Sequence, residues 1–258
     1  MRTRLSLVII PAMLFGLVGH AAAQHTPDAE PTVAADRPHV VDTARVVPEG
    51  HAQLEGGTRV DYFDRSSWSG FALLGRFGFA SNVELRMEAD AFHLSGLRSS
   101  TETSFSYLNR ARIGAKFAAE IVDGTYVSMR PNVTLFPGAV GEPPDVAVGL
   151  RSAVETLFSD TLRFVANVGI SNNPAPEVRR TSLMGGAMLG IAFSPVVETF
   201  VEVSIDAPLQ EFSAGYLLAA DVGIMITPIE RLQIDAFVGT DATRLDGVYG
   251  GVGAAYLF

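Results

Sequence analysis

The chain has 258 residues, a formal net charge of −9 and no cysteine. The absence of cysteine excludes a disulfide framework and a cysteine metal site, and the acidic balance argues against a nucleic-acid-binding face, which would need basic residues to neutralise phosphates. With 48% hydrophobic residues, 25 glycines and a mean hydropathy of +0.25, the chain must either bury its apolar side chains or turn them toward lipid.

The first predicted element is a secretory signal at residues 1–23. Arg2 and Arg4 precede an apolar run from Leu5 to Gly19, and residues 21–23 are the small alanines of a cleavage site. A membrane anchor is the alternative interpretation, but the apolar run is short and the cleavage site is good. We therefore expect a Gram-negative protein that is exported through the inner membrane.

Residues 24–50 form the second predicted unit, a periplasmic N-terminal lead-in. They are rich in Pro, Ala, Asp and His and show no period, which is typical of a flexible segment or of a short tucked one. His25, His39 and His51 are too loosely spaced to indicate a metal site, so solvated histidines are the preferred interpretation. We expect neither a metal nor a cofactor.

Residues 51–258 are predicted to form one all-β domain. Apolar and polar residues alternate in blocks separated by turn residues, as where Val83, Leu85 and Met87 share one face and the charged residues between them share the other. The blocks lie near 51–62, 69–80, 83–94, 106–119, 125–136, 146–157, 162–171, 181–193, 198–206, 214–226, 232–240 and 248–258. This even number of strands, with mostly short turns at one end and longer loops at the other, predicts a transmembrane antiparallel up-and-down β-barrel.

The polar face of the blocks carries charges of both signs in near balance. Acids in 83–94 would stand opposite bases in 106–119, which favours ion pairs between neighbouring strands. Such a face fits a wet lumen better than a soluble surface. We predict that the lumen is lined by Arg86, Glu88, Asp90, Arg110, Arg112 and Lys116. Rings of charged side chains can set channel selectivity, and a structural ion-pair network that plugs the lumen is an equally good interpretation of these residues.

The last block is predicted to close the barrel, with Val252, Ala254, Tyr256 and Phe258 toward lipid. Tyr256 and Phe258 would lie in an aromatic girdle at the periplasmic rim. The terminal phenylalanine after alternate apolar residues also resembles the signal by which the barrel-assembly machinery recognises its clients. The expected partners are therefore outer-membrane lipid, that machinery and a small-molecule solute.

A second chemistry is considered at His93-Leu94-Ser95, which resembles the H-x-S pair of outer-membrane phospholipases and lipid-A deacylases. His93 and Ser95 are an even number of residues from Val83, so in a regular strand they would share its outward face near the extracellular rim. Asn109 on the next strand is the candidate orienting group. Those enzymes usually show H-x-S-N, whereas Gly96 follows here. An interfacial histidine and a loop serine are the preferred interpretation.

The segment ADRPHVVDTARVVPEGHAQLEGG at 35–57 resembles the first part of a family of bacterial outer-membrane transporters named after the MetA pathway of phenol degradation. That family shows D-R-P, an acidic residue, V-P-x-G and then Q-x-E-x-G. The matching residues are Asp36, Arg37, Pro38, Asp42, Val47, Pro48, Gly50, Gln53, Glu55 and Gly57. His39 stands where members usually carry Asp, and Ala44 where Pro is common. The resemblance implies an outer-membrane barrel that moves small solutes, aromatic or hydrophobic ones among them.

The sequence therefore predicts a channel or transporter of the cell outer membrane. Two alternatives stay open: a lipid hydrolase that uses His93 and Ser95, and a structural or adhesive barrel whose loops bind a partner.

Overall fold

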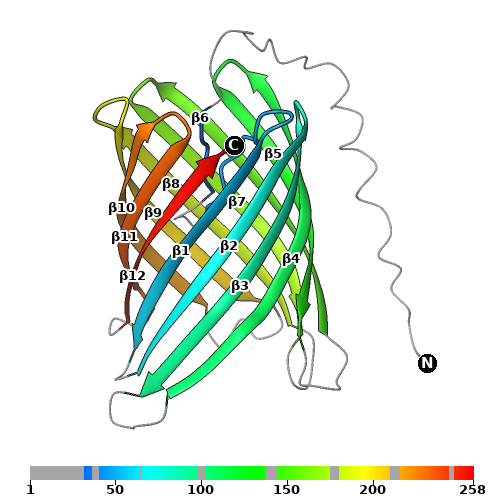
Figure 1. Cartoon of the computed structure of the whole chain (residues 1–258), viewed down its shortest axis with the longest axis vertical. Helices are drawn as coiled ribbons and strands as arrows, with labels where there is room; N and C mark the ends of the chain where they lie inside the picture. Colours follow the sequence, from blue (N-terminus) through cyan, green and yellow to red (C-terminus); the bar gives the residue numbers. More distant parts are fainter. Residues whose placement is uncertain are drawn as a thin grey trace, which may run out of the picture.

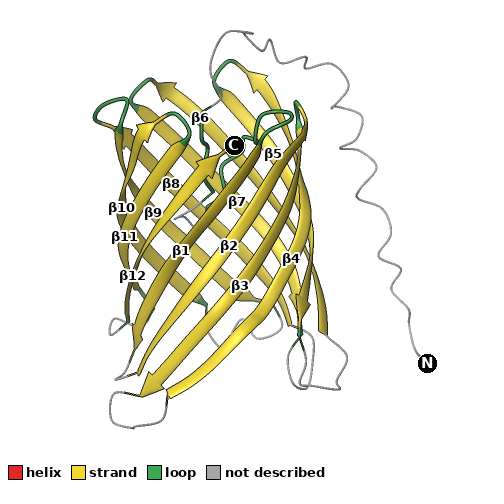
Figure 2. Ribbon diagram, in the orientation of Figure 1, coloured by secondary structure: helices red, strands yellow, loops and turns green. Residues whose placement is uncertain are grey.

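The computed structural model describes residues 32–36, 41–63, 66–97, 103–137, 145–174, 180–209, 216–243 and 247–258. Within these ranges the chain forms a closed barrel of twelve antiparallel strands (Figures 1 and 2). The predicted signal at 1–23 lies outside the described residues.

Each strand pairs with its neighbours in the sequence, and β1 pairs with both β2 and β12, which closes the wall. The strands are β1 (Ala52–Phe63), β2 (Ser66–Ala80), β3 (Val83–Leu97), β4 (Thr103–Val122), β5 (Thr125–Phe136), β6 (Asp145–Ser159), β7 (Leu162–Asn173), β8 (Arg180–Ala192), β9 (Val197–Pro208), β10 (Leu217–Ile229), β11 (Leu232–Asp241) and β12 (Val248–Leu257). The predicted up-and-down barrel is confirmed.

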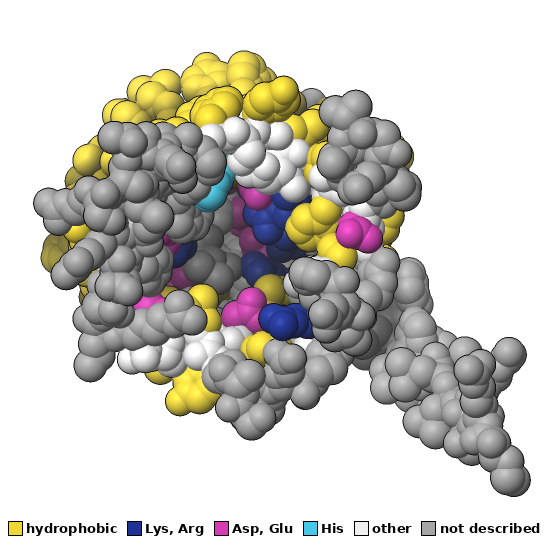
Figure 3. Space-filling view, turned by 90° about the horizontal axis from the view of Figure 1, so that it is seen from below, with side chains coloured by type: hydrophobic (Ala, Val, Ile, Leu, Met, Phe, Trp, Pro, Cys, Tyr) yellow, Lys and Arg dark blue, Asp and Glu magenta, His cyan; other side chains and the backbone are white. Residues whose placement is uncertain are grey.

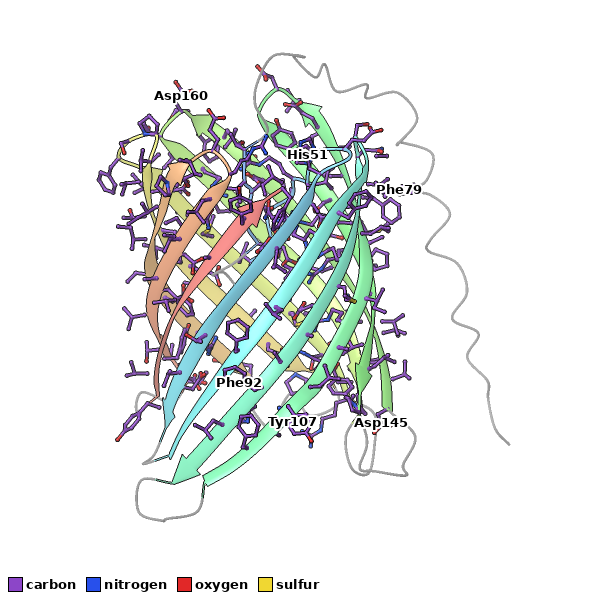
Figure 4. The ribbon with its side chains drawn as sticks, in the orientation of Figure 1. His51, Phe79, Phe92, Tyr107, Asp145 and Asp160 are labelled. Carbon is purple, nitrogen blue, oxygen red and sulfur yellow. The ribbon has the colours of Figure 1, made fainter. Side chains whose placement is uncertain are left out.

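The outer face of the wall is apolar. Met87 is 65% exposed and Phe79 is 64% exposed, whereas the charged neighbours Glu84 and Arg86 are buried. Figure 4 shows Phe79 directed away from the barrel near one end and Tyr107 near the other. An outward apolar surface of this extent, with polar residues inside, is the arrangement of a membrane barrel. Among the described residues, no helix is long and apolar enough to cross a membrane.

The two ends of the barrel differ in the length of their connections. Turns at 81–82, 123–124, 160–161, 193–196 and 230–231 define the short-turn end, which also holds the chain end at Phe258 (Figure 1). Connections at 98–102, 137–144, 174–179, 209–216 and 242–247, with the brief one at 64–65, define the long-loop end. Closed pairing leaves no sheet edge, so every strand has a partner on both sides.

The final strand takes the predicted orientation. Tyr256 and Phe258 are exposed on the outer face, and their ring centroids lie 4.8 Å apart in an edge-on contact. The Phe258 N–H donates to the Ala52 carbonyl at 2.8 Å, which fixes the chain end beside the start of β1. The aromatic end of the chain is therefore part of the wall.

Candidate functional site

The N-terminal segment lies inside the barrel. We call its described residues, 32–36 and 41–50, the plug; Figure 2 shows it as loop within the strands of the short-turn half. Its two ends are tied to the short-turn end, because Val33 N donates to Glu230 O at 2.7 Å and Gly50 N donates to Gly78 O at 2.8 Å. Of the two arrangements that the sequence allows for the lead-in, these residues take the tucked one.

Four glutamates of the wall bind the backbone of the plug. All four are fully buried, and they come from β1, β3, β6 and β9. The plug meets the sheet only at an isolated bridge between Glu49 and Gly78 among the described residues, so its other buried N–H groups need different acceptors, and ionised carboxylates are strong ones. The bonds run from Asp36 N to Glu55 at 3.0 Å, from Val47 N to Glu84 at 2.9 Å, from Ala44 N to Glu155 at 2.9 Å and from Val41 N to Glu202 at 3.2 Å.

Asp36 of the plug lies among three bases of the wall. Lys116 Nζ donates to its carboxylate at 2.8 Å, Arg86 pairs with the same oxygen, and Arg76 lies 3.8 Å away. Burial alone would raise the pKa of Asp36, but these three positive charges outweigh it and hold the pKa well below its ordinary value. The Asp36 carboxylate is thus an anion at neutral pH.

Asp42 makes the second ionic attachment. Its carboxylate lies 2.9 Å from Arg130 and 3.2 Å from Arg151, and its backbone exchanges two hydrogen bonds with the Asn167 amide. Burial favours a raised pKa for Asp42, yet Arg130 and Arg151 lower it to about 2. Because the pKa is depressed, this attachment is fully present above the unfolded pKa of about 3.9 and is lost as the pH falls toward 2.

Apolar contacts complete the seat of the plug. Val41 is 1% exposed and belongs to a cluster with four wall residues, Val165, Met188, Phe200 and Met225. The wall opposite it is thinned by Gly186, where a Cβ would lie 2.7 Å from Val41 Cγ2. The barrel is therefore shaped to receive the plug.

A test of this seat comes from two glycines of β2. A Cβ on Gly78 would overlap the Pro48 carbonyl oxygen and lie 2.5 Å from that of Val47, whereas on Gly75 the nearest atom would be 3.8 Å away. We expect Gly78→Ala to displace the plug and Gly75→Ala to leave it in place. Since the chain lacks cysteine, Ala44→Cys can report the change through maleimide labelling. We expect labelling about ten times faster with Gly78→Ala, the factor that a shift of about 1.4 kcal/mol gives; equal labelling in both backgrounds would contradict the described seat.

All six residues that were predicted to line the lumen lie on the lumen-facing side of the barrel wall. Arg86 and Lys116 hold the plug, as described. The others form a cluster in the long-loop half, where Arg112 pairs with Glu88 at 2.8 Å and Arg110 pairs with Asp90 at 3.0 Å. Arg112 Nε also donates to Thr134 Oγ1 at 3.2 Å. The predicted pairing of acids and bases between neighbouring strands is therefore present.

The lumen holds a cavity toward each of its two ends. The outer cavity, about 300 Å³, lies on the long-loop side and is lined by Arg110, Arg112, Arg130 and Arg151 with polar and apolar neighbours. Seen from that end, Figure 3 shows basic side chains in the hollow, with acidic ones beside them. The inner cavity, about 490 Å³, lies at the short-turn end and is lined in part by plug residues 33–35 and 45.

The predicted orientation of His93 is wrong. The register of β3 shifts between Asp90 and Phe92 against both β2 and β4, and Phe92 and Leu94 are on the outer face. This β-bulge inserts a residue and reverses the alternation, so His93 faces the lumen. Asn109 lies in the bulged part of β4 and is exposed. The structure does not bring His93 and Asn109 to one face, and the side chain of Ser95 lies outside its described part.

The residues of the family resemblance meet where the plug joins the wall. Gln53 Nε2 donates to Glu55 at 2.8 Å and to Ala34 O at 3.2 Å, and Glu55 accepts the N–H of Asp36. Gly50 has a φ of +78°, a conformation that favours glycine, where the chain turns from the plug into β1. Arg37 and Pro38 lie outside the described residues.

The sequence did not indicate the plug-binding role of the four glutamates. Each is a single acid in the polar half of a strand, and nothing in one strand's pattern links it to the N-terminal segment. The nearest signal was the Q-x-E element, which contains Glu55. In the part of the chain that the structure describes, no group of three or more acids and histidines is placed to hold a metal ion.

A comparison of the sequence with protein-family models and with curated proteins finds no match. Solved structures of similar fold include the KdgM porin (13% identity, TM-score 0.51, covering 78% of this chain and 98% of that one). The NanC porin is similar as well (8% identity, TM-score 0.56, 80% and 98%). So is the COG4313 outer membrane channel from Pseudomonas putida F1 (11% identity, TM-score 0.55, 83% and 98%). The chain therefore has the porin-like β-barrel fold of outer-membrane channels.

Proposed function

We propose that the protein is an outer-membrane channel for small solutes and that the plug closes its lumen at rest. The observation that carries this proposal is the way the plug is held. It joins no strand ladder of the barrel and is bound mainly by side chains: four glutamates at its backbone and two sets of bases at its carboxylates. A segment bound in this way can leave without opening the wall.

The proposal places the short turns in the periplasm and the long loops outside the cell, as in other outer-membrane barrels. A solute would enter the outer cavity from the long-loop end and leave through the inner cavity once the plug has moved. The resemblance of the N-terminal segment to the MetA-pathway family favours small aromatic or hydrophobic solutes. Export by the signal at 1–23 and insertion by the barrel-assembly machinery belong to the same proposal.

The other functions have less support. A lipid hydrolase would need His93, Ser95 and an orienting group on one face, and the bulge in β3 separates His93 from Asn109. A purely structural barrel would not need a plug bound to charged groups across half of the wall. Loss of 98–102 and 175–179 without a change in binding to cells or surfaces would count further against an adhesive barrel.

Recording in planar bilayers tests the proposal. We expect the purified protein to show rare, brief openings and to let small solutes into liposomes slowly, because the resting lumen is closed. Heat-modifiable migration on a gel, from an outer-membrane fraction, serves as the control that the barrel is folded. Absence of conductance and uptake, both in the parent protein and after removal of the plug, would reject the channel.

A further inference from the structure

Arg130 and Arg151 face one another directly in the pairing of β5 with β6. Like charges at such a position normally repel and weaken a sheet. Here the carboxylate of Asp42 lies 2.9 Å from Arg130 and 3.2 Å from Arg151. Asp42 belongs to the plug, so the counterion of this pair sits on a segment that is held by side chains and hydrogen bonds.

The outer cavity reaches the same two arginines. Four guanidinium groups, from Arg110, Arg112, Arg130 and Arg151, line it, while their partners Glu88 and Asp90 are not among the residues that line it. Among the described lining residues the only carboxylate is that of Asp206. The cavity thus presents mainly donors, and guanidinium groups bind carboxylates with paired, charge-assisted hydrogen bonds.

Arg130 adds an independent observation. It is 6% exposed, and its Nε atom is buried with no hydrogen-bond partner among the residues that the structure describes. A buried donor without a partner is rare in folded proteins and calls for an explanation such as an absent ligand. The surroundings suit an organic molecule, because Asn132, Thr134 and Ser171 offer polar contacts and Phe136 and Met184 offer apolar ones. The volume of about 300 Å³ matches the lower range of small-molecule sites.

We propose that the outer cavity binds the carboxylate of a small organic anion, and that this carboxylate replaces Asp42 between Arg130 and Arg151 and so releases the plug. The inference rests on the proposed function and names both the solute class and the signal for opening. The solute is an organic acid with an apolar body, of about the size of benzoate. The channel then opens when its own solute is present.

The exchange is physically reasonable because one carboxylate replaces another. Removing Asp42 alone would leave buried Arg130 and partly buried Arg151 facing one another without this counterion, which is strongly unfavourable. An incoming carboxylate restores the compensation, and Asp42 regains water as the plug leaves. A ligand shifts such an equilibrium only by its difference in affinity for the two states. Here the difference is large, since Asp42 and the solute compete for one place.

The test uses benzoate and, as its neutral counterpart, benzyl alcohol. Benzoate at neutral pH should accelerate maleimide labelling of Ala44→Cys about ten-fold, which corresponds to a shift of about 1.4 kcal/mol in the plug equilibrium. It should raise the open probability in bilayers by a similar factor. Benzyl alcohol should do neither.

Variants separate binding from plug release. Arg112→Gln removes a cavity donor that makes no described contact with the plug, so it should weaken the benzoate response. Asp42→Asn should open the channel without benzoate. Arg59→Gln is the matched control: Arg59 pairs with Asp61 at 2.8 Å, is not among the described residues that line the outer cavity, and should retain the full response.

The outcomes distinguish the two proposals. A plug-deleted barrel that conducts, together with a parent protein that ignores benzoate, overturns the anion site and leaves the channel intact. A benzoate response that Arg112→Gln does not weaken overturns it as well. A plug-deleted barrel that conducts nothing rejects the channel itself, whatever benzoate does to labelling.

Discussion

Deletion of residues 32–47 is expected to convert rare openings into a lasting conductance. The deletion removes the Val41 contact with the apolar cluster and the backbone that the four glutamates bind, so water should fill the space. The wall should survive, since its closure comes from strand pairs that do not include the plug. Open probability should rise about ten-fold for each 1.4 kcal/mol by which the plug favours the closed state.

Single-channel recording measures this effect, and deletion of 24–31 is the control. That deletion removes a neighbouring part of the lead-in with a similar composition. It leaves every described plug contact in place, so the resting conductance should not change. If the 32–47 deletion migrates as a folded, heat-modifiable barrel and still shows only the parent's rare openings, the plug is not what closes the channel.

Replacement of Arg76 by Met is expected to have the largest effect on stability. The Arg76 side chain is fully buried, and it lies 2.8 Å from Glu55 and 2.7 Å from Glu84. Met keeps much of the volume but leaves these buried carboxylates without their shared counterion. Removing one partner of a buried ion pair costs about 3–5 kcal/mol. The free energy of unfolding should therefore fall by about this amount.

Denaturant titration in detergent, followed by the gel shift of the folded barrel, measures the loss. Arg110→Met is the matched control: both side chains of its ion pair with Asp90 are about one-third exposed, and exposed pairs contribute only about 0.2–1 kcal/mol. In the 32–47 deletion background the cost of Arg76→Met should shrink, because water then reaches Glu55 and Glu84. An unchanged cost there would show that the wall alone, and not the plug, buries this arginine.

The barrel was predictable because alternation is a local property. Each strand must turn one face to lipid and one to the lumen, so period-two blocks gave the strand positions closely; β10, for example, was predicted at 214–226 and lies at Leu217–Ile229. The same rule failed at His93. An inserted residue in β3 reverses every later position in the strand, and single-sequence periodicity cannot reveal where a bulge will form.

The plug seat was only partly predictable. Arg86 and Lys116 were expected in the lumen from their parity, but their partner Asp36 lies far from them in sequence. The acceptors of the plug backbone come from four separate strands. Contacts of this kind depend on how far each strand is shifted along the barrel axis relative to its neighbours. That shift is set by the strand register, which the sequence alone does not give.

The four glutamates limit which residues the plug can carry. They accept the peptide N–H groups of residues 41, 44 and 47, so apolar substitutions at these positions should be tolerated wherever volume permits, except proline, which has no N–H to give. Position 44 is instructive, because proline is common there in the family that the segment resembles. A protein with such a plug and proline at that place would lack one of these hydrogen bonds, and its plug should leave more readily than this one.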